Sequence, residues 1–214
     1  MLHNVKQLYG KKLGAIDGDI GHIKDFYFDD KTWAVRYVVA DTGSWLSGRE
    51  ILLSPNAFGT DAFGNPDIVG NALGVHLTRK QIEGSPSIDS HRPISRQDEE
   101  QYYNYYGWSG YWQDGTGWSG AGIPIVIPPT IPAPPPVPRS VLPEDNHLRS
   151  AKALVGYDIR TVDDTIGAVS SLMIAGKEWR VHELVIETGS WFSGKQILIL
   201  TKNVTRIAET GSEI

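Results

Sequence analysis

The sequence contains no cysteine. This absence excludes disulfides and thiolate metal sites, so the composition does not indicate an oxidising compartment. No apolar run approaches the roughly 20 residues that a membrane-spanning helix needs. Residues 1–6 also lack the apolar segment of a signal peptide. We therefore expect a cytoplasmic protein without a membrane span, either free in the cytoplasm or peripheral to a membrane complex.

An excess of basic charge is missing too. The chain has 20 Lys and Arg residues against 25 Asp and Glu residues, a formal net charge of −5. A general nucleic-acid binder presents a basic stripe instead, although a local basic patch is compatible with this composition. We therefore expect no direct nucleic-acid partner.

Motifs of catalysis and metal binding are absent as well. The sequence has no P-loop, no dinucleotide-binding glycine fingerprint and no nucleophile elbow. His22 with Asp25, and Asp89 with His91, come nearest to a metal pair, but ordinary surface polar residues explain them better. The sequence therefore predicts no catalytic residue, no cofactor and no metal site, and the protein is not expected to be an enzyme. The histidines stand at positions 3, 22, 76, 91, 147 and 182.

What the sequence does contain is an internal repeat. Residues 42–49 read TGSWLSGR, and residues 188–195 read TGSWFSGK, 146 positions later. The same shift aligns Trp33 with Trp179 without a gap. A repeat of this kind decides the architecture, because each copy is one structural unit.

Each copy is predicted to form a small β unit. We place the units at residues 1–82 and 150–214, with a linker at 83–149. Short β-branched and aromatic runs between Gly, Pro and Asp turns predict an all-β fold of two small barrels. The counterpart of the first unit's last strand, residues 72–77, would fall beyond Ile214. The second unit is therefore predicted to lack that strand, and we expect its open edge to be covered by the linker, the N-terminal segment or a second subunit.

The clearest predicted strand covers residues 33–40. Alternation puts Arg36 on one face and the large apolar side chains on the other. That apolar face is predicted to consist of Trp33, Val35, Tyr37 and Val39. The second copy has Glu183 at the position of Tyr37, which is awkward for a core face and suggests that this end of the strand reaches solvent.

Smaller local signals complete the first unit. The spacing of apolar residues at 20–28 predicts a β-bulge. Trp45, between two turn glycines, is predicted to be an apolar plug. Thr78 is predicted to cap a short helical turn, and the polar residues 96–101 are predicted to hold a short helix.

The positions that the two copies share are mainly turn glycines and large apolar residues. Polar positions change freely, as from Arg36 to His182. A duplicated active site would have kept polar groups, so the repeat is interpreted as a duplicated scaffold. The predicted structural signature comprises Gly21, Trp33, Gly43, Trp45, Gly48, Gly167, Trp179, Gly189, Trp191 and Gly194.

The linker is rich in aromatic residues and proline. Tyrosines and tryptophans crowd residues 102–118, and prolines follow at residues 124–138 as a semi-rigid spacer. The aromatic stretch either packs back onto a barrel or forms a surface for a partner; stacking on nucleic-acid bases is a remote third alternative. The predicted partner-binding residues are Tyr105, Trp108, Tyr111 and Trp112.

Three motifs resemble the PRC-barrel domain. They are Gly21-x-Ile23-x-Asp25, the stretch WAVRYVVADTG at residues 33–43, and GREILLSP at residues 48–55. The tyrosine-rich stretch further resembles bacterial members that carry two such repeats. The family includes the cytoplasmic domain of the photosynthetic reaction centre H subunit and the C-terminal domain of a ribosome maturation factor. The resemblance implies a small β-barrel and supplies no catalytic residue.

Together these features predict a non-catalytic module for protein–protein interaction or assembly. Its expected partners are proteins, including a second copy of the chain bound through the open edge of the second barrel. One alternative is a factor associated with ribosome or RNA processing. Another is a regulator attached to a membrane photosynthetic or electron-transfer complex. An enzyme would instead show a deep pocket with convergent polar groups where the two units meet.

Overall fold

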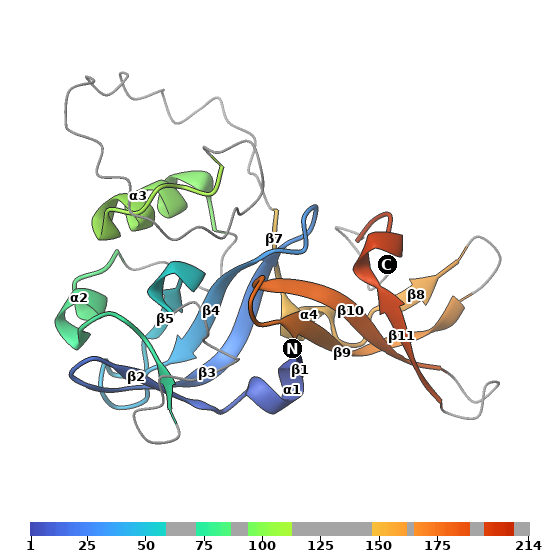
Figure 1. The fold of residues 1–214 in the computed structure, drawn as a ribbon, viewed down its shortest axis with the longest axis horizontal. Helices are drawn as coiled ribbons and strands as arrows, with labels where there is room; N and C mark the ends of the chain where they lie inside the picture. The colour runs from blue at the N-terminus through green and yellow to red at the C-terminus, as the bar shows by residue number, and fades with distance from the viewer. Residues whose placement is uncertain (59–71, 87–93, 113–146, 162–164, 189–194, 208–214) are drawn as a thin grey trace.

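The two repeats fold into two β-sheets that lie side by side (Figure 1). The computed structural model describes residues 1–58, 72–86, 94–112, 147–161, 165–188 and 195–207. Strands dominate and helices are short, so the predicted all-β class is confirmed. Among the described residues, the strand pairings form open sheets and do not close either one into a ring.

The first sheet has the strand order β5-β4-β3-β2-β6, with β7 also paired to β3. The second has the order β1-β9-β10-β11, with β8 also paired to β9. The strands are β1 Leu2–Asn4, β2 Lys12–Ala15, β3 Gly18–Asp29, β4 Val35–Asp41, β5 Glu50–Leu53, β6 Leu73–Gly74, β7 Leu148–Ser150, β8 Asp158–Arg160, β9 Thr165–Ala175, β10 Arg180–Glu187 and β11 Gln196–Leu200. The helices are α1 Val5–Leu8, α2 Arg79–Glu83, α3 Arg96–Tyr106 and α4 Ala151–Leu154, with 3-10 turns η1 Pro55–Ala57 and η3 Thr201–Asn203.

Strand β3 is long and irregular, as its spacing predicted. Its pairing with β4 shifts register between Ile23 and Asp25, which confirms the expected bulge. The turn that follows is held by the Asp29 carboxylate, which accepts hydrogen bonds from the backbone N–H groups of Lys31 and Thr32 at 3.0 and 2.8 Å. This turn leads the chain into β4.

The predicted face of β4 was wrong, because the register shifts a second time. Tyr27 pairs with Tyr37 but Phe28 pairs with Val35, so one residue of β4 is unmatched. Trp33 lies before the strand, in the turn, with a φ of 61°. The bulge breaks the alternation and divides the expected face in two. Trp33, Val35, Val38 and Ala40 face the main core, whereas Tyr37 and Val39 face a second apolar cluster on the opposite side.

The two repeats exchange their first strands. Strand β1, at the start of the chain, pairs with β9 of the second repeat, with Leu2 opposite Ala175. Strand β7, at the start of the second repeat, pairs with β3 of the first, with Leu148 opposite Asp29. Leu148 and Ala175 lie 146 positions after Leu2 and Asp29, so the two exchanges have the same register.

Between the exchanged strands, the repeats meet around a pseudo-two-fold axis. Ala34 forms an antiparallel bridge with its own counterpart, Arg180. On either side, the Val35 N–H donates to the Trp179 carbonyl at 2.6 Å, and the Val181 N–H donates to the Trp33 carbonyl at 2.9 Å. Buried residues of both repeats belong to one apolar cluster. The repeats therefore share a core.

Several local predictions can be compared with this fold. Trp45 is only half-buried, with the Arg79 guanidinium 4.6 Å above its ring, so it covers the core from the rim. Thr78 caps α2 in a capping box with Gln81, as predicted. The expected strand at 72–77 shortens to β6, which pairs in parallel with β2. The second hairpin, with Gly189, Trp191 and Gly194, lies outside the described residues.

The open edge of the second unit is only partly explained. The N-terminal segment, one of the three segments expected to cover this edge, does join the second sheet. It pairs there with β9, however, and not with the open edge at β8. No strand within the described ranges pairs with the other side of β8, where β6 would lie by analogy with the first sheet. The division into residues 1–82, 83–149 and 150–214 stays a prediction.

Candidate interaction surfaces

Helix α3 covers the outer face of the first sheet (Figure 1). Its N-cap is Ser95, whose side chain accepts a hydrogen bond from the Asp98 N–H in a capping box, and its C-cap is Gly107 in the left-handed conformation. Tyr102 and Tyr103 lie three and four positions after Glu99, so helical spacing places them next to Glu99 on the buried side of the helix. The resulting cluster joins the sheet residues Tyr37, Val39 and Leu52 to Ile94, Tyr102 and Tyr103.

The hydroxyl of Tyr102 binds the edge strand of this sheet. It donates to the Leu52 carbonyl at 2.9 Å and accepts from the Ser54 N–H at 3.0 Å. Burial raises the pKa of Tyr102 well above its ordinary value of 10.0, so the hydroxyl keeps its proton and can do both. This side chain takes the place of a further strand at the edge of β5.

A buried carboxylate, Glu99, lies between α3 and the sheet. It is fully buried and accepts hydrogen bonds from the hydroxyls of Tyr37 at 3.0 Å and Tyr111 at 2.8 Å. Arg96 forms an ion pair with it at 2.9 Å, and His147 lies 3.5 Å away. Burial raises the pKa of Glu99 above 4.5, although Arg96 and the hydrogen bonds oppose this shift.

The Glu99 cluster holds two separate parts of the linker, at Tyr111 and at His147, against the first repeat. The Tyr111 hydroxyl lies 2.7 Å from His147 Nε2, and the Arg36 guanidinium lies 3.6 Å from the centre of the Tyr111 ring. Tyr111 lies just before the undescribed residues 113–146, and His147 directly follows them. Sequence reasoning missed this cluster, because Glu99 lies in a polar run that offers no sign of burial.

The four predicted partner-binding aromatics lie on or just after α3. Tyr105 is 44% exposed, and its hydroxyl donates to the Gln81 carbonyl at 2.9 Å. Trp108 is half-buried and stacks on Tyr106 with 4.5 Å between ring centroids. Tyr111 and Trp112 are half-buried as well and surround Tyr103. All four help to hold α3 on the first repeat, and Tyr105 presents the most surface to solvent.

The equivalent face of the second repeat is exposed. Leu198 is the counterpart of Leu52, yet it is 60% exposed where Leu52 is 5% exposed. Leu200, two residues further along the same face of the strand, is 38% exposed, and Ile197, on the other face, is 37% exposed. This difference explains the awkward substitution of Tyr37 by Glu183: α3 covers the first position, and no described helix covers the second.

The described part of the chain shows neither a metal-binding group nor a membrane-spanning helix. Its His, Asp and Glu residues form no group of three or more that could hold a metal ion. His22 lies 3.9 Å from Asp41, and the Asp89–His91 pair falls outside the described residues. No helix in these ranges is both long and apolar enough to cross a membrane.

The fold thus defines a duplicated β scaffold with an added aromatic helix. Comparison with protein families gives a match for the first repeat: residues 3–75 match the PRC-barrel domain. The match supports, for this part of the chain, the family that its motifs resemble. A comparison with curated proteins found no match.

Proposed function

We propose that the protein is a non-catalytic module for protein–protein interaction or assembly, acting without a cofactor. The exposed apolar strand β11 carries this proposal. Its side chains Leu198 and Leu200 sit on the sheet face that an aromatic helix covers in the first repeat, and Ile197 is exposed on the other face of the same strand. Apolar residues on an exposed edge strand favour pairing with another chain. The match to the PRC-barrel domain, a non-catalytic module, is consistent with this role.

The first repeat indicates the chemistry of the partner. Leu52, the counterpart of Leu198, packs against tyrosine rings, and a hydroxyl binds the edge of its strand. A partner that docks on β11 would offer the same combination of apolar or aromatic side chains and groups that bond to the strand edge. A second copy of the chain is one such partner. A second proposed contact surface consists of Tyr105 on α3 and of Trp108, Tyr111 and Trp112 just after it.

Site-specific photo-crosslinking in the native host tests the proposal. A photo-reactive phenylalanine analogue replaces Leu198 in one version of the protein and Ile16 in another. Ile16 is a matched control because it is also apolar and 69% exposed, but it lies on the turn between β2 and β3. We expect a defined protein to be cross-linked at position 198 and not at position 16, and to be lost when Leu200→Asp is added.

Identification of the captured protein separates the alternatives. A ribosomal protein would favour the ribosome-associated function, and a subunit of a membrane electron-transfer complex would favour the regulatory one. A cross-link to the protein itself would identify the homodimer. Equal capture at positions 198 and 16, or none at either, would contradict a binding role for β11.

A further inference from the structure

The pseudo-two-fold axis relates two tryptophans whose surroundings differ. Phe58 follows the turn η1, and Val204 occupies the equivalent position after η3. The local backbone is the same, since the N–H of each residue donates to the carbonyl three positions earlier at 3.0 Å. The Phe58 ring crosses to the other repeat and packs on Trp179, with 5.0 Å between ring centroids. At the equivalent place on the other side of the axis, Trp33 lies near Val204 instead of a phenylalanine.

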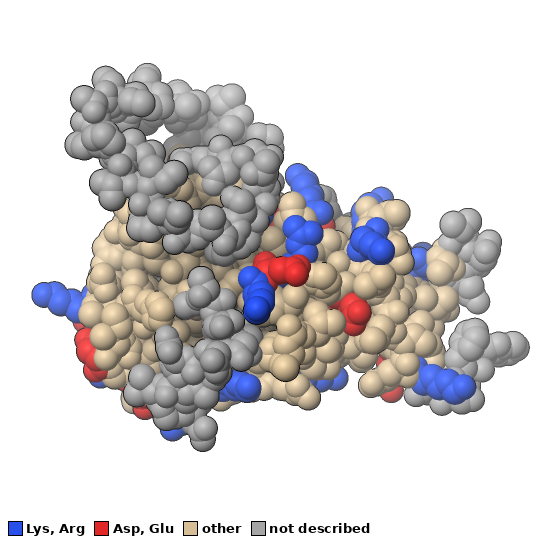
Figure 2. All heavy atoms as spheres, in the orientation of Figure 1, with Lys and Arg blue, Asp and Glu red and all other residues tan. Residues whose placement is uncertain are grey.

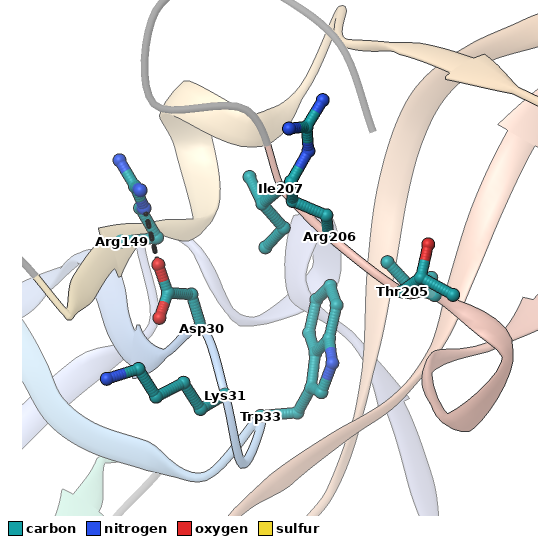
Figure 3. Close-up of a pocket in the computed structure, with 8 residues that line it drawn as sticks. Asp30, Lys31, Trp33, Arg149, Thr205, Arg206 and Ile207 are labelled. Carbon is teal, nitrogen blue, oxygen red and sulfur yellow. Dashed lines mark hydrogen bonds and ion pairs between the residues drawn. The ribbon is translucent and has the colours of Figure 1, made fainter.

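A cavity of about 400 Å³ lies on the Trp33 side of the axis. Trp33, Val204 and Ile207 form its apolar wall, and Phe28 stacks on Trp33 from within the core at 5.2 Å. In Figure 3 the indole stands between the Asp30–Arg149 pair and Thr205, with Ile207 above it. Val204 is smaller than the phenylalanine at the equivalent position, and the cavity lies beside it. Trp33 lines this cavity although only 6% of the residue is exposed.

The rim of this cavity is positively charged. Lys31, Arg149 and Arg206 line it, together with the single carboxylate of Asp30, which pairs with Arg149 at 3.0 Å. Figure 2 shows Lys and Arg atoms gathered around a few acidic atoms near the middle of the face, where the repeats meet. A local positive charge in a chain of net charge −5 favours an anionic ligand.

We propose that this junction cavity binds a small aromatic anion. A planar ring lies beside Trp33 in the space that Phe58 fills beside Trp179. A carboxylate or phosphate on that ring forms ion pairs with Arg206 and Lys31 and competes with Asp30 for Arg149. Ring contact supplies the affinity, and the guanidinium groups orient the acidic group. This site is distinct from the face of β11 and does not depend on a protein partner.

Titration of the full chain with a small panel tests the site. The probes are 2-naphthoate and adenosine monophosphate, which combine an aromatic system with an anion. The controls are 2-naphthamide, which has no charge, and cyclohexanecarboxylate, which has no aromatic ring. Affinity is measured by calorimetry, and the indole N–H resonances of Trp33 and Trp179 are followed by NMR. We expect at least one aromatic anion to bind and to shift the indole N–H resonance of Trp33. The resonance of Trp179, which packs against Phe58, should not shift.

Two variants make the test specific. Val204→Phe supplies the ring that the other side already has, and it is expected to weaken binding at least tenfold, about 1.4 kcal/mol. Lys31→Ala combined with Arg206→Ala changes exposed side chains only, so it keeps the fold even if Val204→Phe does not. This double variant is expected to lower the affinity for the aromatic anion several-fold and to reduce the salt dependence of binding. Unchanged affinity in both variants, equal binding of 2-naphthamide, or no binding by either aromatic anion at millimolar concentration would overturn the proposal.

Discussion

Trp33 and Trp179 each present a backbone carbonyl to the other repeat, and both do so from a left-handed backbone conformation. Their φ angles are 61° and 46°, values that bulky residues rarely adopt. Each carbonyl accepts a hydrogen bond from the residue two positions beyond the other tryptophan, Val181 or Val35. The conformation costs about 1–2 kcal/mol for each residue. It recurs because the same turn is needed twice to bring the repeats together around their axis.

The exchanged strand β1 should stabilise the second repeat more than the first. Deleting residues 2–4 removes the partner of β9 at Met173, Ile174 and Ala175. We expect amide hydrogen exchange there to accelerate at least tenfold, because local opening becomes easier by about 1.4 kcal/mol or more. Residues 27–29, paired with β7, provide an internal control and should change less. Equal acceleration at both sites would indicate general destabilisation.

Two equivalent glycines should be intolerant of a side chain. Gly21 has a φ of 122°, and a Cβ there would collide with the Asp41 carbonyl; Gly167 has a φ of 154° and would collide with the Glu187 carbonyl. Alanine at either position is expected to cost more than about 3 kcal/mol of unfolding free energy, as backbone strain adds to the clash. Gly10→Ala is the matched control, because its φ is 76° but its Cβ would meet no atom within 4 Å. Its expected cost is about 1–2 kcal/mol. Urea denaturation measures the unfolding free energy of the three alanine variants. Equal losses at positions 21, 167 and 10 would contradict a steric clash at Gly21 and Gly167.

The hydroxyl of Tyr102 should matter more than that of Tyr105. Tyr102→Phe leaves the fully buried Ser54 N–H without its acceptor, and the expected loss is about 1–3 kcal/mol of unfolding free energy. Tyr105→Phe removes a hydrogen bond from a side chain that is 44% exposed, so solvent replaces it at a cost below about 0.5 kcal/mol. Thermal or chemical denaturation compares the two. Similar losses would show that Tyr102 acts by packing alone.

The stability of the protein should carry a pH signature from Glu99. Burial raises the pKa of Glu99 above 4.5, so the folded state binds this proton more tightly than the unfolded state. The contribution is full below pH 4.5 and is lost as pH rises through the folded-state pKa. The difference in unfolding free energy between wild type and Glu99→Gln should therefore shrink as pH rises above 4.5. Burial raises the pKa of Asp25 as well, so Glu99→Gln removes only part of the pH dependence of the unfolding free energy.

In the Glu99 experiment, urea denaturation at a series of pH values gives the difference directly. Asp25→Asn is a useful companion, since Asp25 belongs to another part of the core and accepts a hydrogen bond from Ser150 at 2.5 Å. Parallel pH profiles for wild type and Glu99→Gln would show that Glu99 does not titrate differently in the two states.

Much of the fold could be predicted because it depends on local signals. The repeat, the bulge in β3 and the cap at Thr78 each follow from residues close together in the sequence. The exchanged strands could not, because three residues such as Leu2–Asn4 carry no pattern that tells which sheet they join. The sheet face predicted for Tyr37 was wrong for a related reason. One unmatched residue at a bulge moves every later side chain of the strand to the opposite face of the sheet.

The candidate surfaces were harder to predict than the scaffold. The aromatic stretch at 102–118 left three alternatives open, and burial of Tyr102 and Tyr103 depends on how α3 meets the sheet. Comparison of the repeats proved more informative than either copy alone. The exposed Leu198 and the space beside Val204 both emerge only when each is set against its counterpart, Leu52 or Phe58.

The reciprocal exchange of β1 and β7 bears on how such a chain could have originated. A protein with one copy of the repeat would lack a donor for its own sheet and could obtain one only from a twin molecule, giving a two-fold homodimer. Fusion of two copies keeps every one of those contacts but turns a concentration-dependent association into a unimolecular one. Once both repeats belong to one chain, their sequences can diverge. One repeat can then acquire a covering helix while the other keeps an exposed surface for a different use.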